Sequence, residues 1–133
     1  MRHLLIPIAF LGLSACETGA EQPSRSASDQ RTYDRALAGK TAGKPEKCLP
    51  TYRSNDMTVI DQQTILFREG RTVWVNNTLG ACNGLGRSGS ALVTRNFGPQ
   101  LCRGDIATVA DTTSGMTIGS CALGDFTPYR HAG

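Results

Sequence analysis

Apolar and polar residues alternate along much of the chain between residues 56 and 123, and a period of two is typical of β-strands. Met57 and Val59 alternate with polar neighbours, and Ile65 and Phe67 do so in the next run. This pattern predicts six short strands, near residues 56–61, 64–69, 72–77, 90–95, 105–111 and 116–123. We therefore expect an all-β fold.

Turn-forming residues separate the first three predicted strands. Residues 61–63 (Asp-Gln-Gln) and 69–71 (Glu-Gly-Arg) lie between them, which predicts a meander of tight hairpins. Closing so few strands on themselves would remove exposed sheet edges. The sequence thus predicts a small six-stranded barrel or roll over residues 48–133, with a core small enough to need covalent support.

Residues 17–47 differ in composition from the predicted domain, since they mix Ser, Thr, Ala, Gly and Pro with charges of both signs. Such a stretch buries too little apolar surface to fold alone. A helical turn over residues 28–38, stopped by Gly39, would be marginal in water as an isolated helix. We expect residues 16–47 to form a flexible, disordered linker.

The N-terminus has the layout of an export signal, with a basic start, an apolar run from Leu4 to Leu13 and small residues after it. The apolar run is too short for a membrane span, which needs roughly 20 residues. Residues 13–16 (Leu-Ser-Ala-Cys) resemble the lipobox of bacterial lipoprotein precursors. An ordinary secretory signal with an incidental Cys16 is the alternative.

The lipobox resemblance implies a signal peptide over residues 1–15 and a mature chain that begins with a lipidated Cys16. Its acyl chains would anchor the protein, since each buried methylene contributes about 0.8 kcal/mol of membrane affinity. Glu17 rather than an aspartate follows the cysteine, and this favours the periplasmic face of the outer membrane. The expected location is the cell envelope.

Export also determines how the other cysteines are interpreted, because oxidising compartments allow disulfides to persist. Four cysteines remain once Cys16 is set aside, and they permit three pairings. We favour Cys82 with Cys102, within the middle of the domain, and Cys48 with Cys121, which would tie its start to its last strand. A zinc site is the alternative, although no pair has zinc-knuckle spacing. No metal or cofactor is expected.

Charge says little about partners. The formal net charge is +3 and falls by one when Arg2 leaves with the signal peptide, and both signs are interspersed. Nucleic acid is therefore not expected as a partner. The basic side chains of the predicted domain are all arginines: Arg53, Arg68, Arg71, Arg87, Arg95, Arg103 and Arg130. Arginine suits bidentate pairing with phosphate or carboxylate, so a patch for acidic glycans or lipid headgroups stays open beside ordinary surface charge.

Three literal motifs carry little functional weight. Residues 84–89 (Gly-Leu-Gly-Arg-Ser-Gly) spell a dinucleotide-binding fingerprint, but a short strand rather than a helix is predicted after them. We interpret them as a loop with a tight turn at residues 83–84. Residues 103–105 (Arg-Gly-Asp) are interpreted as a structural turn, and the sequon at residues 76–78 has no weight in a bacterial protein.

Catalytic groups are few. The mature chain retains one histidine, His131, near the C-terminus, which disfavours hydrolytic triads and His-based metal sites. Paired carboxylates could still supply general acid and base. The aspartates available for such a pair are Asp61, Asp105, Asp111 and Asp125. They are more often turn formers and arginine partners, so no enzyme is expected.

Several segments together resemble a family of small Gram-negative lipoproteins of unknown function. The segments are residues 48–50, 59–67, 77–79, 101–106 and 121–126. The resemblance implies a lipoprotein signal, four structural cysteines and a small β domain, and it implies no activity, cofactor or ligand.

Two classes of function remain open. The favoured one is a membrane-anchored, non-enzymatic envelope module that binds a protein or glycan partner. A narrower version is a lysozyme inhibitor, because residues 88–91 (Ser-Gly-Ser-Ala) look like part of the protruding loop of such inhibitors. The other class is a hydrolase that uses paired carboxylates.

Overall fold

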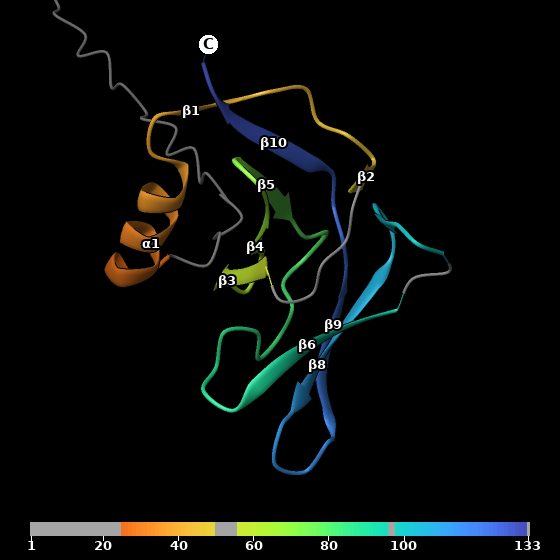
Figure 1. The fold of residues 1–133 in the computed structure, drawn as a ribbon. Coiled ribbons are helices and arrows are strands. Elements are labelled where there is room, and N and C mark those ends of the chain that lie inside the picture. The colour runs from red at the N-terminus through yellow and green to blue at the C-terminus, as the bar shows by residue number, and fades with distance from the viewer. Residues whose placement is uncertain (1–24, 50–55, 96–97, 133) are drawn as a thin grey trace, which may run out of the picture.

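The computed structural model describes residues 25–49, 56–95 and 98–132. These residues form one helix and ten strands, arranged as three antiparallel sheets (Figure 1). The elements are α1 (Ala27–Leu37), β1 (Lys40–Ala42), β2 (Cys48–Leu49), β3 (Met57–Asp61), β4 (Thr64–Glu69), β5 (Thr72–Asn77), β6 (Ser90–Arg95), β7 (Leu101–Cys102), β8 (Ile106–Asp111), β9 (Thr117–Ala122) and β10 (Phe126–His131). The predicted β class is confirmed.

The largest sheet has the strand order β1-β10-β5-β4-β3 and contains the predicted meander. Its central strands are buried on both faces because apolar residues occupy consecutive positions. Phe67 lies opposite Trp74 and faces the main core, whereas Leu66 lies opposite Val75 and faces the other side. Successive side chains of a strand point to opposite faces, so this sheet needs a cover on each.

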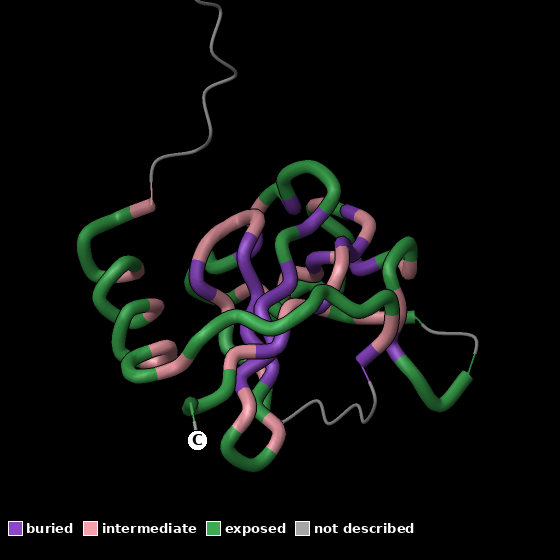
Figure 2. The backbone as a smooth tube through the Cα atoms, turned by 90° about the horizontal axis from the view of Figure 1, so that it is seen from above, coloured by how far each residue is buried: buried purple, intermediate pink, exposed green. Residues whose placement is uncertain are grey.

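Helix α1 covers one of those faces. Ser26 caps the helix, since its hydroxyl oxygen accepts a hydrogen bond from the Asp29 backbone N–H at 3.1 Å. Tyr33, Ala36 and Leu37 recur at helical spacing and pack on the apolar cluster of β3, β4 and β5. Figure 2 shows the more buried side of the helix turned toward the strands. Tertiary packing therefore stabilises a helix that would be marginal alone.

The prediction of a flexible linker is wrong for residues 25–47, the part of the linker that the structure describes. Helix α1 is followed by β1, whose Thr41 lies opposite Arg130 of β10. The turn between them uses Gly39 at φ 72°, a left-handed conformation that glycine adopts without steric cost. The part of the linker nearest Cys16, residues 16–24, lies outside the described residues.

The second layer is the three-stranded sheet β6-β8-β9 (Figure 1). Its inner face carries Leu92, Ala107, Val109 and Cys121, which join the main core with the meander. The two-stranded sheet β2-β7 adds the buried pair Leu49 and Leu101. These three sheets are open, so the predicted closure into a six-stranded barrel or roll is wrong for the described residues.

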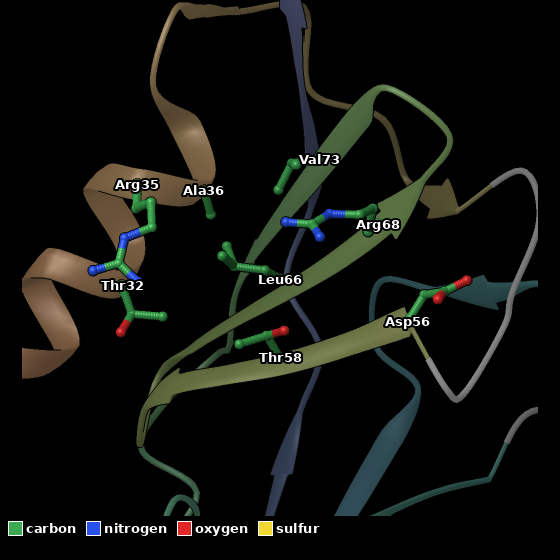
Figure 3. Close-up of a pocket in the computed structure, with 8 residues that line it drawn as sticks. All are labelled: Thr32, Arg35, Ala36, Asp56, Thr58, Leu66, Arg68 and Val73. Atoms are coloured by element: carbon green, nitrogen blue, oxygen red, sulfur yellow. The ribbon is translucent and has the colours of Figure 1, made fainter.

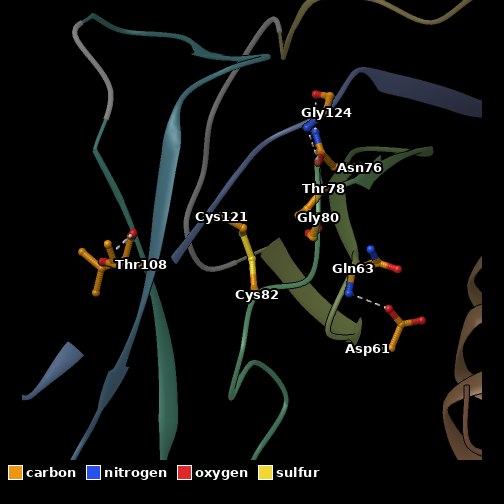
Figure 4. Close-up of a disulfide and its surroundings, with 10 residues drawn as sticks. Asp61, Gln63, Asn76, Thr78, Gly80, Cys82, Thr108, Cys121 and Gly124 are labelled. Carbon is orange, nitrogen blue, oxygen red and sulfur yellow. Dashed lines mark hydrogen bonds between the residues drawn. A yellow bond between two sulfur atoms is a disulfide. The ribbon is translucent and has the colours of Figure 1, made fainter. Parts of the chain in front are cut away.

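The disulfides join Cys48 to Cys102 and Cys82 to Cys121, so the pairing predicted from sequence is wrong. Cys48 and Cys102 lie directly opposite one another in β2 and β7. Cys82 follows β5 and is fully buried beside Cys121 of β9 (Figure 4), so this bond joins the two large sheets inside the core. That two disulfides staple the fold is confirmed.

A buried amide also connects the two layers. Asn76 has 0 % exposure, and its side chain donates to the Gly124 carbonyl at 2.8 Å and accepts from the Gly124 N–H at 3.1 Å (Figure 4). Gly124 lies against the Asn77 backbone carbonyl, where a Cβ atom would clash. This contact fixes the turn from β9 into β10.

Candidate functional site

A cleft of about 160 Å³ lies between α1 and the outer face of the meander (Figure 3). We call it the α1 cleft. Its floor is apolar and consists of Ala36 from the helix with Leu66 and Val73 from the sheet. The other lining residues are polar or charged: Thr32, Arg35, Asp56, Thr58 and Arg68.

Two arginines line this cleft, one on each wall. Arg35 belongs to α1, and Arg68 extends from β4 toward the helix (Figure 3). Neither side chain has an ion pair or a hydrogen bond within the described part of the chain. Their donor groups are therefore available to a ligand. A guanidinium presents five N–H donors in a planar fork, which matches phosphate or carboxylate oxygens.

The remaining polar groups differ in what they can offer a ligand. The Thr32 hydroxyl donates to the Ser28 carbonyl at 3.0 Å, so its oxygen is left as an acceptor. The Thr58 hydroxyl has no partner among the described residues and can donate. Asp56 is exposed and supplies the one carboxylate among the described lining residues. These residues together carry two positive charges and one negative charge.

The helix wall of the cleft is attached to the sheet through Arg25, just before α1. The Arg25 Nε donates to Asp61 Oδ2 at 2.8 Å and Nη2 donates to the Thr64 hydroxyl at 3.1 Å. The same guanidinium lies over the Tyr33 ring at 4.3 Å from its centroid. We call these contacts the Arg25 clasp. They join the start of α1 to the turn between β3 and β4.

The clasp changes the titration of Asp61. Burial raises the pKa of this carboxyl, but hydrogen bonds from Arg25, the Gln63 backbone N–H and Thr64, together with the Arg25 charge, outweigh it and hold the pKa below its ordinary value. The ionised carboxylate therefore stabilises the folded state above its unfolded pKa, and this contribution is lost as the pH falls through the lowered value.

We expect Asp61→Asn to loosen α1 at neutral pH and to cost about 1–2 kcal/mol, because a charge-assisted hydrogen bond is removed from a partly buried pair. Amide hydrogen exchange over residues 27–37 measures the loosening. Arg31→Gln, an exposed change on α1 outside the clasp, is the control. Unchanged α1 protection in Asp61→Asn would contradict a stabilising role for the clasp.

The four aspartates considered for catalysis have separate neighbours. Asp105 accepts from the Cys102 backbone N–H at 2.7 Å, and Asp125 pairs with Arg103 at 2.8 Å. Asp111 accepts from Ser114 and Thr113, and these hydrogen bonds hold its pKa below its ordinary value. Asp61 belongs to the clasp. No two of the four line the same cavity among the cavities described here.

The other segments and residues considered from the sequence have structural roles. The glycines at 84, 86 and 89 have positive φ in a loop that leads into β6, as the loop interpretation predicts, and the buried Leu85 of this loop packs in the main core. The Ser90 hydroxyl donates to the Arg87 carbonyl at 2.7 Å, which ties the Ser88–Ala91 segment to the loop before it. The indole of Trp74 is 2 % exposed, so it belongs to the core rather than to a binding surface.

A second hollow of about 400 Å³ lies beside the clasp and includes Arg25, Asp61, Leu85 and Arg87 in its lining. Arg25 and Asp61 already bind each other there. Among the described residues no group of three or more histidines, cysteines or acidic residues is placed to hold a metal ion. No helix in the same residues is long and apolar enough to span a membrane.

The comparisons add no relative. The chain matches no protein-family model, and comparisons with curated proteins and with solved structures give no significant match. The resemblance to a lipoprotein family stays a prediction.

Sequence reasoning missed most of the α1 cleft because it assigned residues 16–47 to a linker. Arg68 was among the arginines available for acidic ligands, but Thr32 and Arg35 were not considered. The signal was present in the capping residue Ser26 and in Tyr33, Ala36 and Leu37, whose spacing of three and four predicts an amphipathic helix.

Proposed function

We propose that the protein is a non-enzymatic binding module of the cell envelope, anchored through acyl chains on Cys16 to the periplasmic face of the outer membrane. The α1 cleft is its binding site. The observation that carries this proposal is the pair Arg35 and Arg68, which have no partner among the described residues and lie over an apolar floor. Unpaired polar groups that converge above apolar side chains are characteristic of ligand sites.

The chain length between anchor and fold supports the same proposal. Eight residues separate Cys16 from Arg25, where the description of the fold begins. At roughly 3.4 Å per residue, even a fully extended segment reaches only about 30 Å. An anchored module would therefore hold the α1 cleft close to the membrane surface, where envelope partners are concentrated.

The test has two parts, one for the partner that contacts the cleft and one for the membrane anchor. A photoreactive residue in place of Thr58 is expected to crosslink a discrete envelope partner in intact cells, whereas the same residue in place of the exposed Thr113 is not. Cys16→Ser is expected to abolish incorporation of a labelled fatty acid into the protein, because the acylated thiol is removed.

Two outcomes oppose the proposal. If Cys16→Ser incorporates the labelled fatty acid as the parent protein does, Cys16 is not the anchor. If the Thr58 probe yields the same products as the Thr113 probe, the cleft does not bind a specific partner.

A further inference from the structure

We infer that the α1 cleft binds a phosphate ester, an inference that rests on the cleft being the binding site proposed above. The inference names the chemical class of the ligand. It follows from three features of the lining: its charge, the geometry of its donors and the size and character of its floor.

The charge of the lining favours an anion. Arg35 and Arg68 place two positive charges around one small cavity, and within the described residues neither has an anionic partner in contact. Each guanidinium attracts an anion that is bound in the cleft, so both charges favour the same kind of ligand. Asp56 offsets only one of the two charges.

The arrangement of donors favours phosphate over carboxylate. A carboxylate has two oxygens in one plane, so a single arginine fork satisfies both. Here the donors come from three elements: Arg35 on α1, Thr58 on β3 and Arg68 on β4 (Figure 3). A tetrahedral phosphate presents at least three oxygens in different directions, and it can therefore accept from all three walls.

The rest of the lining indicates which group is esterified to the phosphate. Asp56 and the Thr32 oxygen are acceptors, so they suit hydroxyl groups of the ligand. Ala36, Leu66 and Val73 offer a short apolar surface to carbon atoms. The volume of about 160 Å³ is below the roughly 300–1,000 Å³ of pockets for drug-sized ligands. A phosphorylated polyol such as phosphoglycerol fits this description, either as a lipid headgroup or as a soluble ester.

The first arm of the test uses the full-length protein in detergent and in buffer free of phosphate. Titration with glycerol 3-phosphate, followed by amide chemical shifts, is expected to show saturable shifts at the cleft, whereas glucuronate at equal concentration is not. Arg35→Gln and Arg68→Gln should each weaken binding at least tenfold. The matched control is Arg31→Gln, an exposed arginine of α1 outside the cleft, which should change binding less than twofold.

The second arm distinguishes the two sources. The mature-length chain, residues 16–133 with Cys16→Ser, lacks both the signal peptide and the acyl anchor and is mixed with vesicles of phosphatidylglycerol or of phosphatidylcholine. Sedimentation with the phosphatidylglycerol vesicles alone, abolished by Arg68→Gln and by excess glycerol 3-phosphate, identifies a lipid headgroup. Binding of glycerol 3-phosphate without sedimentation identifies a soluble ester. Either result supports the phosphate-ester site.

Two results overturn the inference. The first is the absence of shifts with glycerol 3-phosphate while hydrogen exchange shows α1 protected and the cleft assembled. The second is glucuronate binding as tightly as the phosphate ester. If the Thr58 probe still crosslinks a discrete partner in cells, the proposed function survives and only the ligand class is wrong. If that crosslink is absent too, both fail.

Discussion

Replacing Cys82 and Cys121 together by alanine is expected to lower the free energy of unfolding by about 4 kcal/mol. The bond between them closes a loop with a sequence separation of 39, and loss of such a crosslink frees the unfolded chain by about that amount. A small domain loses roughly 4–8 °C of melting temperature per kcal/mol, so the variant should melt roughly 15–30 °C lower. Thermal unfolding followed by circular dichroism measures the shift.

Cys16→Ser is the control for this variant, because it removes a cysteine that belongs to neither disulfide. Its melting temperature should equal that of the parent protein. If the double variant also melts with the parent, the bond between Cys82 and Cys121 contributes nothing to stability and the pairing itself is in question.

The pairing can be read directly, because trypsin separates the four cysteines into the peptides 48–53, 72–87, 96–103 and 104–130. Digestion without reduction should yield 48–53 joined to 96–103 and 72–87 joined to 104–130. The pairing favoured from sequence would join 72–87 to 96–103 instead. Mass spectrometry distinguishes the two results.

The second large effect is expected for Asn76→Ala, with a loss of about 2–5 kcal/mol. The substitution leaves the Gly124 N–H and carbonyl without the partners they have in a site of 0 % exposure, and each buried unpaired group costs about 1–3 kcal/mol. Urea denaturation should show a lower midpoint with an unchanged slope, since the folded state keeps its extent.

Asn77→Ala is the matched control, because this side chain is the exposed neighbour of Asn76 on β5. Substitutions of this kind usually change stability by less than about 0.5 kcal/mol. Equal midpoints for the two alanine variants would show that the amide of Asn76 does not connect the two layers as described.

The β class and the position of six strands could be predicted from sequence because those strands carry strong local patterns. Three of the predicted strands, at residues 64–69, 72–77 and 90–95, have the same bounds as β4, β5 and β6. Gly70 at φ 58° occupies the turn in the second hairpin, where a glycine signal is expected. The alternation of apolar and polar residues and the turn residues between these strands were sufficient to predict them.

The other strands lack such a pattern. β2 and β7 have two residues each, too few for a period to be visible, and their pairing brings Cys48 opposite Cys102. Residues 126–131 contain Pro128, which argues against a strand in an alternating pattern, yet they form β10 between β1 and β5. The wrong disulfide pairing and the unclosed barrel both follow from these contacts between distant segments.

The α1 cleft depends even more on tertiary contacts. Composition assigned the segment before Cys48 to a linker, because so few large apolar residues occur there. Tyr33, Ala36 and Leu37 are enough to hold a helix in this segment. They pack on Leu66, Val73 and Val75, which the sheet presents on its outer face. Composition alone does not report the surface on which a marginal helix will pack.

The position of β10 has a consequence for the order in which the molecule can be completed. β10 is the last of the described strands along the chain, yet it pairs on one side with β1 and on the other with β5. A chain that emerges from its N-terminal end therefore holds β1 and β5 without their common neighbour until residue 131 has appeared. Assembly of the largest sheet therefore waits for residues 126–131, and a chain that lacks them exposes the backbone of β5 along one edge.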